Sequence, residues 1–456
     1  MAAVLASLTA LQVGSAVAAY RFVILDPGHF HAALVLKRDN PEVAKEVRVF
    51  APPGDDVEAH VALVRGFNAR KDAPTSWNEL VCRDADYLAR FRKWAASGEV
   101  DPKECLVILA GRNNRKGDYC LAAVRAGFNV LSDKPMAITD GEFAKIREAA
   151  GLAERKGLVF ADLMTGRYDV LAALQRALAA DRDLYGEQER GTPDDPAIVE
   201  TSVHHFCKLV DGKPLRRPGW YYDTRQQGEA IVDVTTHLVD GVQWKAFPGE
   251  RLDCSDVSML SARSWATPVT LADFTESTGF ASWPAFLADD VGKDGVLGCK
   301  ANGEFLYALR GVHVRVRVLW NMRAAEGRGD AYGSSMRGSR AEISIRKGVP
   351  SADGTPGLYV TARTDARATE RALKAALDRL SATWPGLGLV ASGKDGEWRV
   401  EAPSGLVIPH EAQFSHVVNE VLGWMRDGSM PRERRVNMLV KYHTLTEAWK
   451  ASRRNR

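Results

Sequence analysis

Three residues that can move protons share one short segment, GEAIVDVTTHLVD, at positions 228–240. Asp233, His237 and Asp240 follow one another at intervals of four and three residues, so a helix would gather them within a narrow arc. The apolar positions would form a packed stripe on the opposite side: Ile231, Val234, Leu238 and Val242. The pattern predicts acid–base chemistry, and the alternative is a solvated face with an ordinary Asp–His pair.

A lysine in the segment LSDKPMAIT (131–139) is the next candidate. Lys134 follows an apolar strand, and Pro135 fixes the turn behind it. A lysine beside Asp133 at the carboxyl edge of a sheet would point into a cleft, where its ammonium can bind a ribose or a substrate hydroxyl. The alternative is a lysine in a surface turn.

The loop DPGHFHA (26–32) follows the first apolar strand, where a dinucleotide fingerprint reads G-x-G-x-x-G. Asp26 and His31 stand at the outer glycine positions, and only Gly28 remains, the glycine that lets the backbone approach a pyrophosphate. We expect a dinucleotide to contact Gly28, His29, Phe30 and His31. Asp26 and the two histidines also suggest half of a metal site, but such a pair more often forms hydrogen bonds, so no metal is predicted.

Aromatic residues precede the acid–base segment in RPGWYYDTRQQGE (217–229). Trp220, Tyr221 and Tyr222 are suited to stacking on a sugar face, and Asp223 or Arg225 to binding its hydroxyls. An aromatic core of the second domain is the equal alternative.

The apolar pattern predicts the elements that position these residues. Up to residue 167, short buried runs alternate with helices, which predicts a Rossmann-like, doubly wound parallel sheet over 20–167 with ligands at the carboxyl ends of its strands. After residue 167, apolar and polar residues alternate with a period of two, as in the segment EFLYALRGVHVRVRVLWNM. It predicts an α+β domain over 168–456 with an open, largely antiparallel sheet. Residues 350–405 read as an insertion with a helix between two short strands.

Composition narrows the class of protein. With 456 residues, 45% hydrophobic, 26% charged and a net charge of +3, the chain is typical of a globular protein without nucleic-acid partners. Six cysteines without metal-site spacing predict free thiols. Residues 1–19 are apolar and end in small residues, so they predict a signal peptide and an exported, periplasmic protein. The alternative is a frayed helix on a cytoplasmic enzyme, and no membrane span is expected.

Two segments carry a resemblance to a known family. GRNNRKGDYCLAAVRAGFNVLSDKP (111–135) resembles the T-P-N-x-x-H and E-K-P segment of the Gfo/Idh/MocA sugar and cyclitol oxidoreductases, with Asn113 at the Asn and Asp133, Lys134 and Pro135 at Glu-Lys-Pro. QGEAIVDVTTHLVD (227–240) is similar to that family's G-G-G-x-x-x-D-x-x-x-H-x-x-D segment.

The resemblance implies NAD or NADP as cofactor and hydride transfer at a carbon of a small carbohydrate or cyclitol. It implies that Lys134, Asp233 and His237 line that carbon, with His237 taking the hydroxyl proton near neutral pH and Asp233 orienting it. Arg167 matches an arginine often found after the fifth strand and is expected to bind substrate, as are Trp220, Tyr222 and Asp223. The second-domain sheet is expected to form a homo-oligomer.

Several positions depart from that family. Arg112 replaces the Pro and Lys116 the His of T-P-N-x-x-H, and the second strand ends in FAPP without an acid for the ribose. A tightly held NAD recycled within each turnover would suit such a loop. Two other functions stay open: a lyase or epimerase using the same acid–base residues, and a non-catalytic sugar-binding protein.

Overall fold

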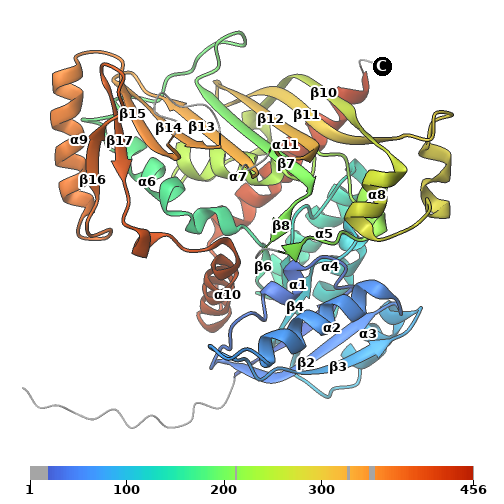
Figure 1. Cartoon of the computed structure of the whole chain (residues 1–456). Helices are drawn as coiled ribbons and strands as arrows, with labels where there is room; N and C mark the ends of the chain where they lie inside the picture. The colour runs from blue at the N-terminus through green and yellow to red at the C-terminus, as the bar shows by residue number, and fades with distance from the viewer. Residues whose placement is uncertain (1–18, 211–212, 326–328, 349–354, 455–456) are drawn as a thin grey trace, which may run out of the picture.

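The computed structural model of the chain describes residues 19–210, 213–325, 329–348 and 355–454. Residues 1–18 of the expected signal peptide therefore lie outside the described residues. Two sheets dominate the structure, one near the N-terminus and a larger one above it in Figure 1. All six cysteines are free. Among the described residues, no helix combines the length and apolarity needed to cross a bilayer.

The first sheet has six parallel strands in the order β3-β2-β1-β4-β5-β6. The strand order changes direction between β1 and β4, which confirms the doubly wound fold and its switch point. The central strands are almost wholly buried because helices cover both faces. The bounds are β1 Tyr20–Leu25, β2 Val43–Ala51, β3 Asn78–Arg83, β4 Cys105–Leu109, β5 Asn129–Ser132 and β6 Phe160–Asp162.

Helices cover this sheet from both sides. α3 (Tyr87–Ala95), α4 (Lys116–Arg125) and α5 (Asp140–Lys156) pack on one face. α1 (His31–Leu34) and α2 (Asp55–Asn68) pack on the other, together with α10 (His410–Arg426) from the far end of the chain. Figure 1 shows α10 standing between the two sheets. The first domain therefore depends on a C-terminal helix for part of its core.

The second sheet has nine strands in the order β10-β11-β12-β7-β13-β14-β15-β17-β16. Only β12 and β7 are parallel, so the sheet is mostly antiparallel, as expected. Alternate residues of β12 are buried. The bounds are β7 Ile198–Cys207, β10 Val257–Val269, β11 Leu297–Leu309, β12 Val312–Arg323, β13 Ala331–Arg337, β14 Ala341–Lys347, β15 Gly357–Ala362, β16 Gly388–Ala391 and β17 Glu397–Glu401.

The expected insertion extends one edge of this sheet. β15, β16 and β17 continue the strand order, and α9 (Ala366–Leu380) joins β15 to β16. A separate two-stranded sheet consists of β8 (Leu209–Val210) and β9 (Lys213–Pro214), and α8 (Leu271–Thr278) follows β10.

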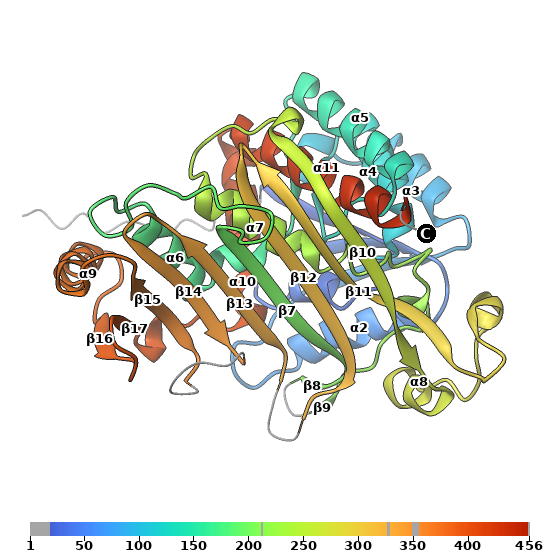
Figure 2. The same cartoon turned by 90° about the horizontal axis from the view of Figure 1, so that it is seen from above.

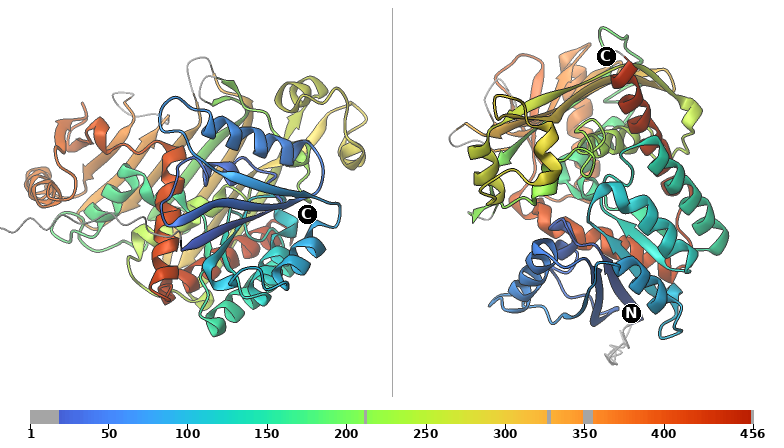
Figure 3. Two further views of the ribbon diagram at one scale, coloured as in Figure 1. Left: turned by 90° about the horizontal axis from the view of Figure 1, so that it is seen from below. Right: turned by 90° about the vertical axis from the view of Figure 1, so that its right-hand side faces the viewer.

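One face of the large sheet carries α6 (Val170–Ala179), α7 (Thr235–Ala246) and α11 (Arg432–Arg454), and Figure 2 shows the opposite face toward the viewer. α11 also packs along α5 of the first domain, seen as the red and teal helices at the right of Figure 3. Helix α11 of the second domain thus packs against the first domain as well as against its own sheet.

The sequence predicts one helix over the segment 228–240, and this prediction is wrong for its first half. Helix α7 begins only at Thr235. Gly228 has a φ of +92°, and a Cβ there would lie 2.6 Å from the Ile138 side chain, so the chain enters in a turn. Asp233 lies in the turns before α7, whereas His237 and Asp240 are on its first turns. The expected apolar stripe is confirmed as buried.

A buried charge cluster joins α7 to α11 and to the first sheet. The Arg167 guanidinium donates two hydrogen bonds to Asp240, at 2.8 and 2.7 Å. The Lys441 ammonium lies 2.7 Å from Asp240 and 2.6 Å from Asp162. All four side chains are largely buried, so each charge depends on its partners.

We predict that Asp240→Asn lowers the free energy of unfolding by about 3 kcal/mol or more, since buried Arg167 loses its paired anion and Lys441 loses one of its two. Burial raises the pKa of Asp240, but Arg167 and Lys441 outweigh it and hold the pKa below its usual range. Because the pKa of Asp240 is lower in the folded protein than in the unfolded chain, its carboxylate stabilises the fold above about pH 4, the pKa in the unfolded chain. This stabilisation is lost progressively as the pH falls below about 4. The difference between wild type and variant should therefore shrink below about pH 4 in urea unfolding measured from pH 3 to 7.

Asp118→Asn is the matched control, because Asp118 pairs with Lys145 in a half-exposed ion pair at 2.6 Å. It should change the free energy of unfolding by less than about 1 kcal/mol. Equal effects of the two substitutions would contradict a structural role for the Asp240 cluster.

Candidate active site

The loops after β1, β4 and β5 meet at the carboxyl edge of the parallel sheet. Gly111, after β4, allows this meeting, because a Cβ there would lie 1.9 Å from the main-chain oxygen of Asp26. The His29 amide donates to the Ala110 carbonyl at 2.7 Å, and the Asp133 amide to the carbonyl of Leu109 at 2.6 Å. The β1 loop is thereby laid across the end of β4 toward β5.

Two imidazoles converge on one carboxylate at this edge. The Nδ1 atom of His29 lies 3.2 Å from Asp133, and Nδ1 of His31 lies 3.0 Å from each of the two Asp133 oxygens. Burial lowers the pKa of His31 to about 4 and also lowers that of His29, so both rings are neutral at pH 7. The His31 ring also packs against His410 and Phe414 of α10.

Lys134 reaches across to the second domain. Its ammonium lies 2.6 Å from Oδ1 of Asp233, and both side chains are about nine-tenths buried or more. Oδ2 of Asp233 accepts from the Gln227 amide at 2.9 Å, and the Asn113 amide donates to Gln227. Asn113 therefore acts on Asp233 through Gln227, and it positions the ion pair from the first domain.

Lys116 holds the turn that carries Lys134. Its buried ammonium donates to the main-chain carbonyls of Asp133 at 2.8 Å and Pro135 at 3.2 Å, and a longer contact reaches that of Lys134. Burial lowers the pKa of Lys116 to about 8. The Lys134–Pro135 peptide is cis. Lys116, which stands where the T-P-N-x-x-H pattern has His, thus stabilises the turn through its main-chain carbonyls.

His237 lies in the same electrostatic neighbourhood. Burial, together with the charge of Lys134, lowers the pKa of His237 to about 3. The charge of Asp133 acts in the opposite direction but is the weaker influence. The sequence-based expectation of a pKa near neutrality is therefore wrong for the protein without ligand, because burial of this ring cannot be read from its spacing. The imidazole is therefore neutral at pH 7 and, in the protein without ligand, a weak base.

The loop at the expected dinucleotide site is charged but compensated. Asp26 accepts from Tyr119 at 3.0 Å and from Arg112 at 3.1 Å, and Arg112 also donates to Asp56 at 3.0 Å. The indole of Trp220 donates to Asp56 at 2.8 Å and lies against the loop, where a Cβ on Gly28 would be 3.0 Å from the ring. Arg112 therefore neutralises the acid that replaces the first glycine.

Two other expected substrate residues, Tyr222 and Asp223, are held by contacts within the second domain. Tyr222 lies in the aromatic core of the second domain, with its hydroxyl bonded to Ser277 at 2.5 Å. Asp223 accepts from Arg225 and Gln226 within its own turn. These contacts favour the structural alternative for both residues.

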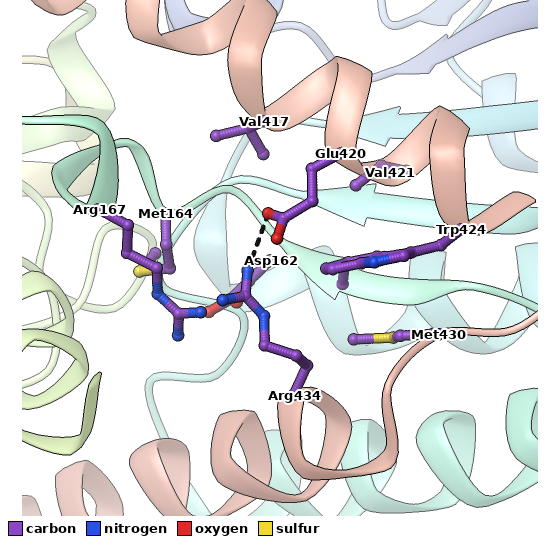
Figure 4. Close-up of a pocket in the computed structure, with 10 residues that line it drawn as sticks. Asp162, Met164, Arg167, Val417, Glu420, Val421, Trp424, Met430 and Arg434 are labelled. Atoms are coloured by element: carbon purple, nitrogen blue, oxygen red, sulfur yellow. Dashed lines mark hydrogen bonds and ion pairs between the residues drawn. The ribbon is translucent and has the colours of Figure 1, made fainter. Parts of the chain in front are cut away.

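Arg167 is committed to Asp240 and lines a small cavity between β6 and α10 (Figure 4). The cavity volume is about 10 Å³, about enough for one water and too small for a sugar. In Figure 4, Glu420 and Arg434 form an ion pair beside it. We therefore leave Arg167 out of the site that is proposed below.

Sequence reasoning missed Gln227 and His410 as members of the site and gave Lys116 only as a departure from a motif. His410 comes from a helix about 380 residues away from the β1 loop, so spacing carries no signal for it.

Known proteins resemble the chain along most of its length. The family model described as "Putative oxidoreductase C terminal domain" matches residues 174–453. A crystal structure of a "putative oxidoreductase" from Parabacteroides merdae ATCC 43184 is 41% identical, with a TM-score of 0.91, over 96% of this chain and 98% of that chain.

A 1,5-anhydro-D-fructose reductase from Ensifer adhaerens is 30% identical over 145 residues, which is 32% of this chain. The match spans 38% of the length of that reductase. KijD10, a 3-ketoreductase from Actinomadura kijaniata in complex with NADP and TDP-benzene, has a TM-score of 0.56 at 12% identity, over 95% of this chain and 97% of that chain. At this identity the likeness to KijD10 shows the fold alone.

We predict that Lys116→Met lowers the free energy of unfolding by about 1–3 kcal/mol, since buried carbonyls lose their donor. Because the turn is loosened, the main-chain amide hydrogens of residues 133–134 should also exchange with solvent faster. Urea unfolding and hydrogen exchange by mass spectrometry measure the two effects. Lys145→Met, which removes a half-exposed lysine of similar reach, should leave both unchanged. If the amides of residues 133–134 exchange as slowly in Lys116→Met as in the wild type, the positioning role of Lys116 is contradicted.

Proposed function

We propose that this chain, which belongs to the Gfo/Idh/MocA-like oxidoreductase family, transfers hydride between NAD(P) and a hydroxyl or ketone of a small carbohydrate or cyclitol. One observation carries the proposal: Lys134 and Asp233 form a buried ion pair at the carboxyl edge of the parallel sheet, where ligands of such sheets bind. The sugar reductase from Ensifer adhaerens supports a carbohydrate as the substrate class.

The residues of the β1 loop fit a dinucleotide pyrophosphate. Gly28 has no side chain, and the amides of Phe30 and His31 donate to no acceptor among the described residues. Arg112 supplies the positive charge that offsets Asp26 and Asp56. When bound, the dinucleotide supplies the hydride donor or acceptor. In this chain Trp220 would cover the loop and limit release of the cofactor, which supports tight binding.

The chain's own residues would handle the proton and the charge. The neutral imidazole of His237 accepts the proton of a substrate hydroxyl. The oxygen that loses this proton becomes negative, and the Lys134 ammonium stabilises it in a site of low dielectric constant. Asp233 orients Lys134 and balances its charge, and Gln227 fixes the rotamer of Asp233.

We predict that His237→Ala lowers kcat by about 10²–10⁴-fold and changes KM much less, because proton transfer occurs in the transition state. Lys134→Ala should lower kcat and raise KM, and Asp233→Asn should keep the fold but lose much of the rate. The assay follows nicotinamide absorbance over a panel of aldoses, glycosides and cyclitols. Circular dichroism confirms folding of each variant.

His313→Ala is the matched control, since His313 lies on β12 of the second sheet and its ring contacts the main-chain carbonyl of Arg190 at 3.2 Å. It should keep wild-type kcat. A folded His237→Ala protein with near-normal kcat would contradict proton transfer by His237 and leave α7 with a structural role only.

A protein that binds neither NAD nor NADP but converts a sugar would indicate a lyase or epimerase. Lys134, Asp233 and His237 would then abstract and return a proton.

A further inference from the structure

Among the described residues, no Lys or Arg side chain contacts the buried carboxylate of Asp133, although the charge of Lys116 acts on it from a longer distance. The Asp133 side chain is 3% exposed, and among the described residues only the His29 and His31 rings form ion-pair or hydrogen-bond contacts with it. Lys116 reaches the main-chain carbonyl of Asp133, and Lys134 is bonded to Asp233. A buried negative charge flanked by neutral imidazoles is costly unless a positive group joins it.

A second cluster of the same composition shows the contrast. His204 and His205 both place Nδ1 on Asp330, at 3.2 and 3.1 Å. There the Lys208 ammonium lies 2.7 Å from the same carboxylate and supplies the cation. Asp330 is also about one-quarter exposed, whereas Asp133 is almost fully enclosed. Within the part of the chain that the structure describes, two histidines contact one aspartate in two places, and only at Asp133 does no lysine contact the carboxylate.

The donor atoms around Asp133 have the spacing of metal ligands. Bonds of about 2.1 Å to nitrogen and oxygen place neighbouring ligands about 3.0–3.4 Å apart in octahedral and tetrahedral sites. The two His–Asp separations are 3.2 and 3.0 Å, and one ligand atom from each residue lies within 4.8 Å of the others.

We propose that His29, His31 and Asp133 bind a divalent transition-metal ion, with at least one position open to water or a substrate oxygen. Two histidines and one carboxylate form a ligand set used by zinc and non-haem iron sites with open positions. The sequence alone favours hydrogen bonding for these histidines and points to Asp26 as their acid. The structure turns Asp26 toward Arg112 and Tyr119 and brings Asp133 to them instead.

The ion would face the residues of the proposed reaction. The His410 ring lies 6.1 Å from the His31 ring between centroids, and Lys134 directly follows Asp133 in the chain. A metal ion here would polarise a sugar oxygen beside Lys134. The nearby Lys116 and Lys134 ammonium groups would weaken the affinity for the metal ion, and they favour hydroxide over water as the remaining ligand. This role rests on the proposed function, whereas metal binding itself does not.

The test uses the full chain, stripped with a chelator and then titrated with Zn²⁺ or Co²⁺. We expect about one equivalent of zinc per chain by elemental analysis after gel filtration, a raised Tm, and visible absorption bands on Co²⁺ loading. Co²⁺ reports the coordination geometry on the wild type alone, so this readout does not depend on any variant folding. Less than about a tenth of an equivalent of zinc, with no Co²⁺ bands, would overturn the proposal.

Variants assign the ligands. His29→Ala, His31→Ala and the isosteric Asp133→Asn should each weaken Zn²⁺ binding by more than about 100-fold, since they remove direct ligands. His204→Ala and His205→Ala are matched controls from the cluster that holds its own lysine, and they should bind zinc as the wild type does. Unchanged affinity in folded Asp133→Asn, or loss confined to the control variants, would overturn the assignment.

Two assays keep this proposal distinct from the proposed function. Zinc binding is measured without substrate or nucleotide, and NAD(P) binding is measured on the chelated protein by calorimetry. A chain that binds zinc but no dinucleotide contradicts the proposed function alone. A chain that binds dinucleotide but no zinc contradicts the metal site alone.

Discussion

The buried ion pair between Lys134 and Asp233 is the contact on which the site depends. It joins the carboxyl end of β5 to the turns before α7, so it fixes how the first domain meets the second. Neither charge is stable at this depth alone, and the surrounding structure serves both. Lys116 holds the turn of Lys134, and Gln227, itself held by Asn113, holds Asp233. The domain interface is therefore also the proposed reaction site.

The architecture follows from patterns that the sequence displays openly. Strands such as FVIL and CLVIL are apolar throughout because helices cover both faces of their sheet, and β12 alternates because its sheet is covered on one face. β3 escaped prediction, since this edge strand is partly exposed and its residues NELVCR show neither pattern clearly. α7 starts later than its periodicity indicates, because Gly228 and contacts with a neighbouring strand hold the preceding residues in turns.

The site was only partly predictable for the same physical reasons. Spacing and strand ends identified Lys134, Asp233 and His237 as candidates, but spacing carries no information about burial. Burial sets the low pKa of His237 and makes Lys116 a support for the turn. Partners distant in the chain were also hidden: His31 meets Asp133 across 102 residues, and Arg167 meets Asp240 across 73.

The central claim is that this edge of the sheet binds a dinucleotide for hydride transfer. Native mass spectrometry of the purified chain, before and after incubation with NAD and with NADP, tests it most directly. We expect each chain to carry the mass of one dinucleotide, and we expect Gly28→Val, which crowds the loop against Trp220, to abolish the adduct. A chain that keeps its bare mass at saturating concentrations of both dinucleotides would contradict the account.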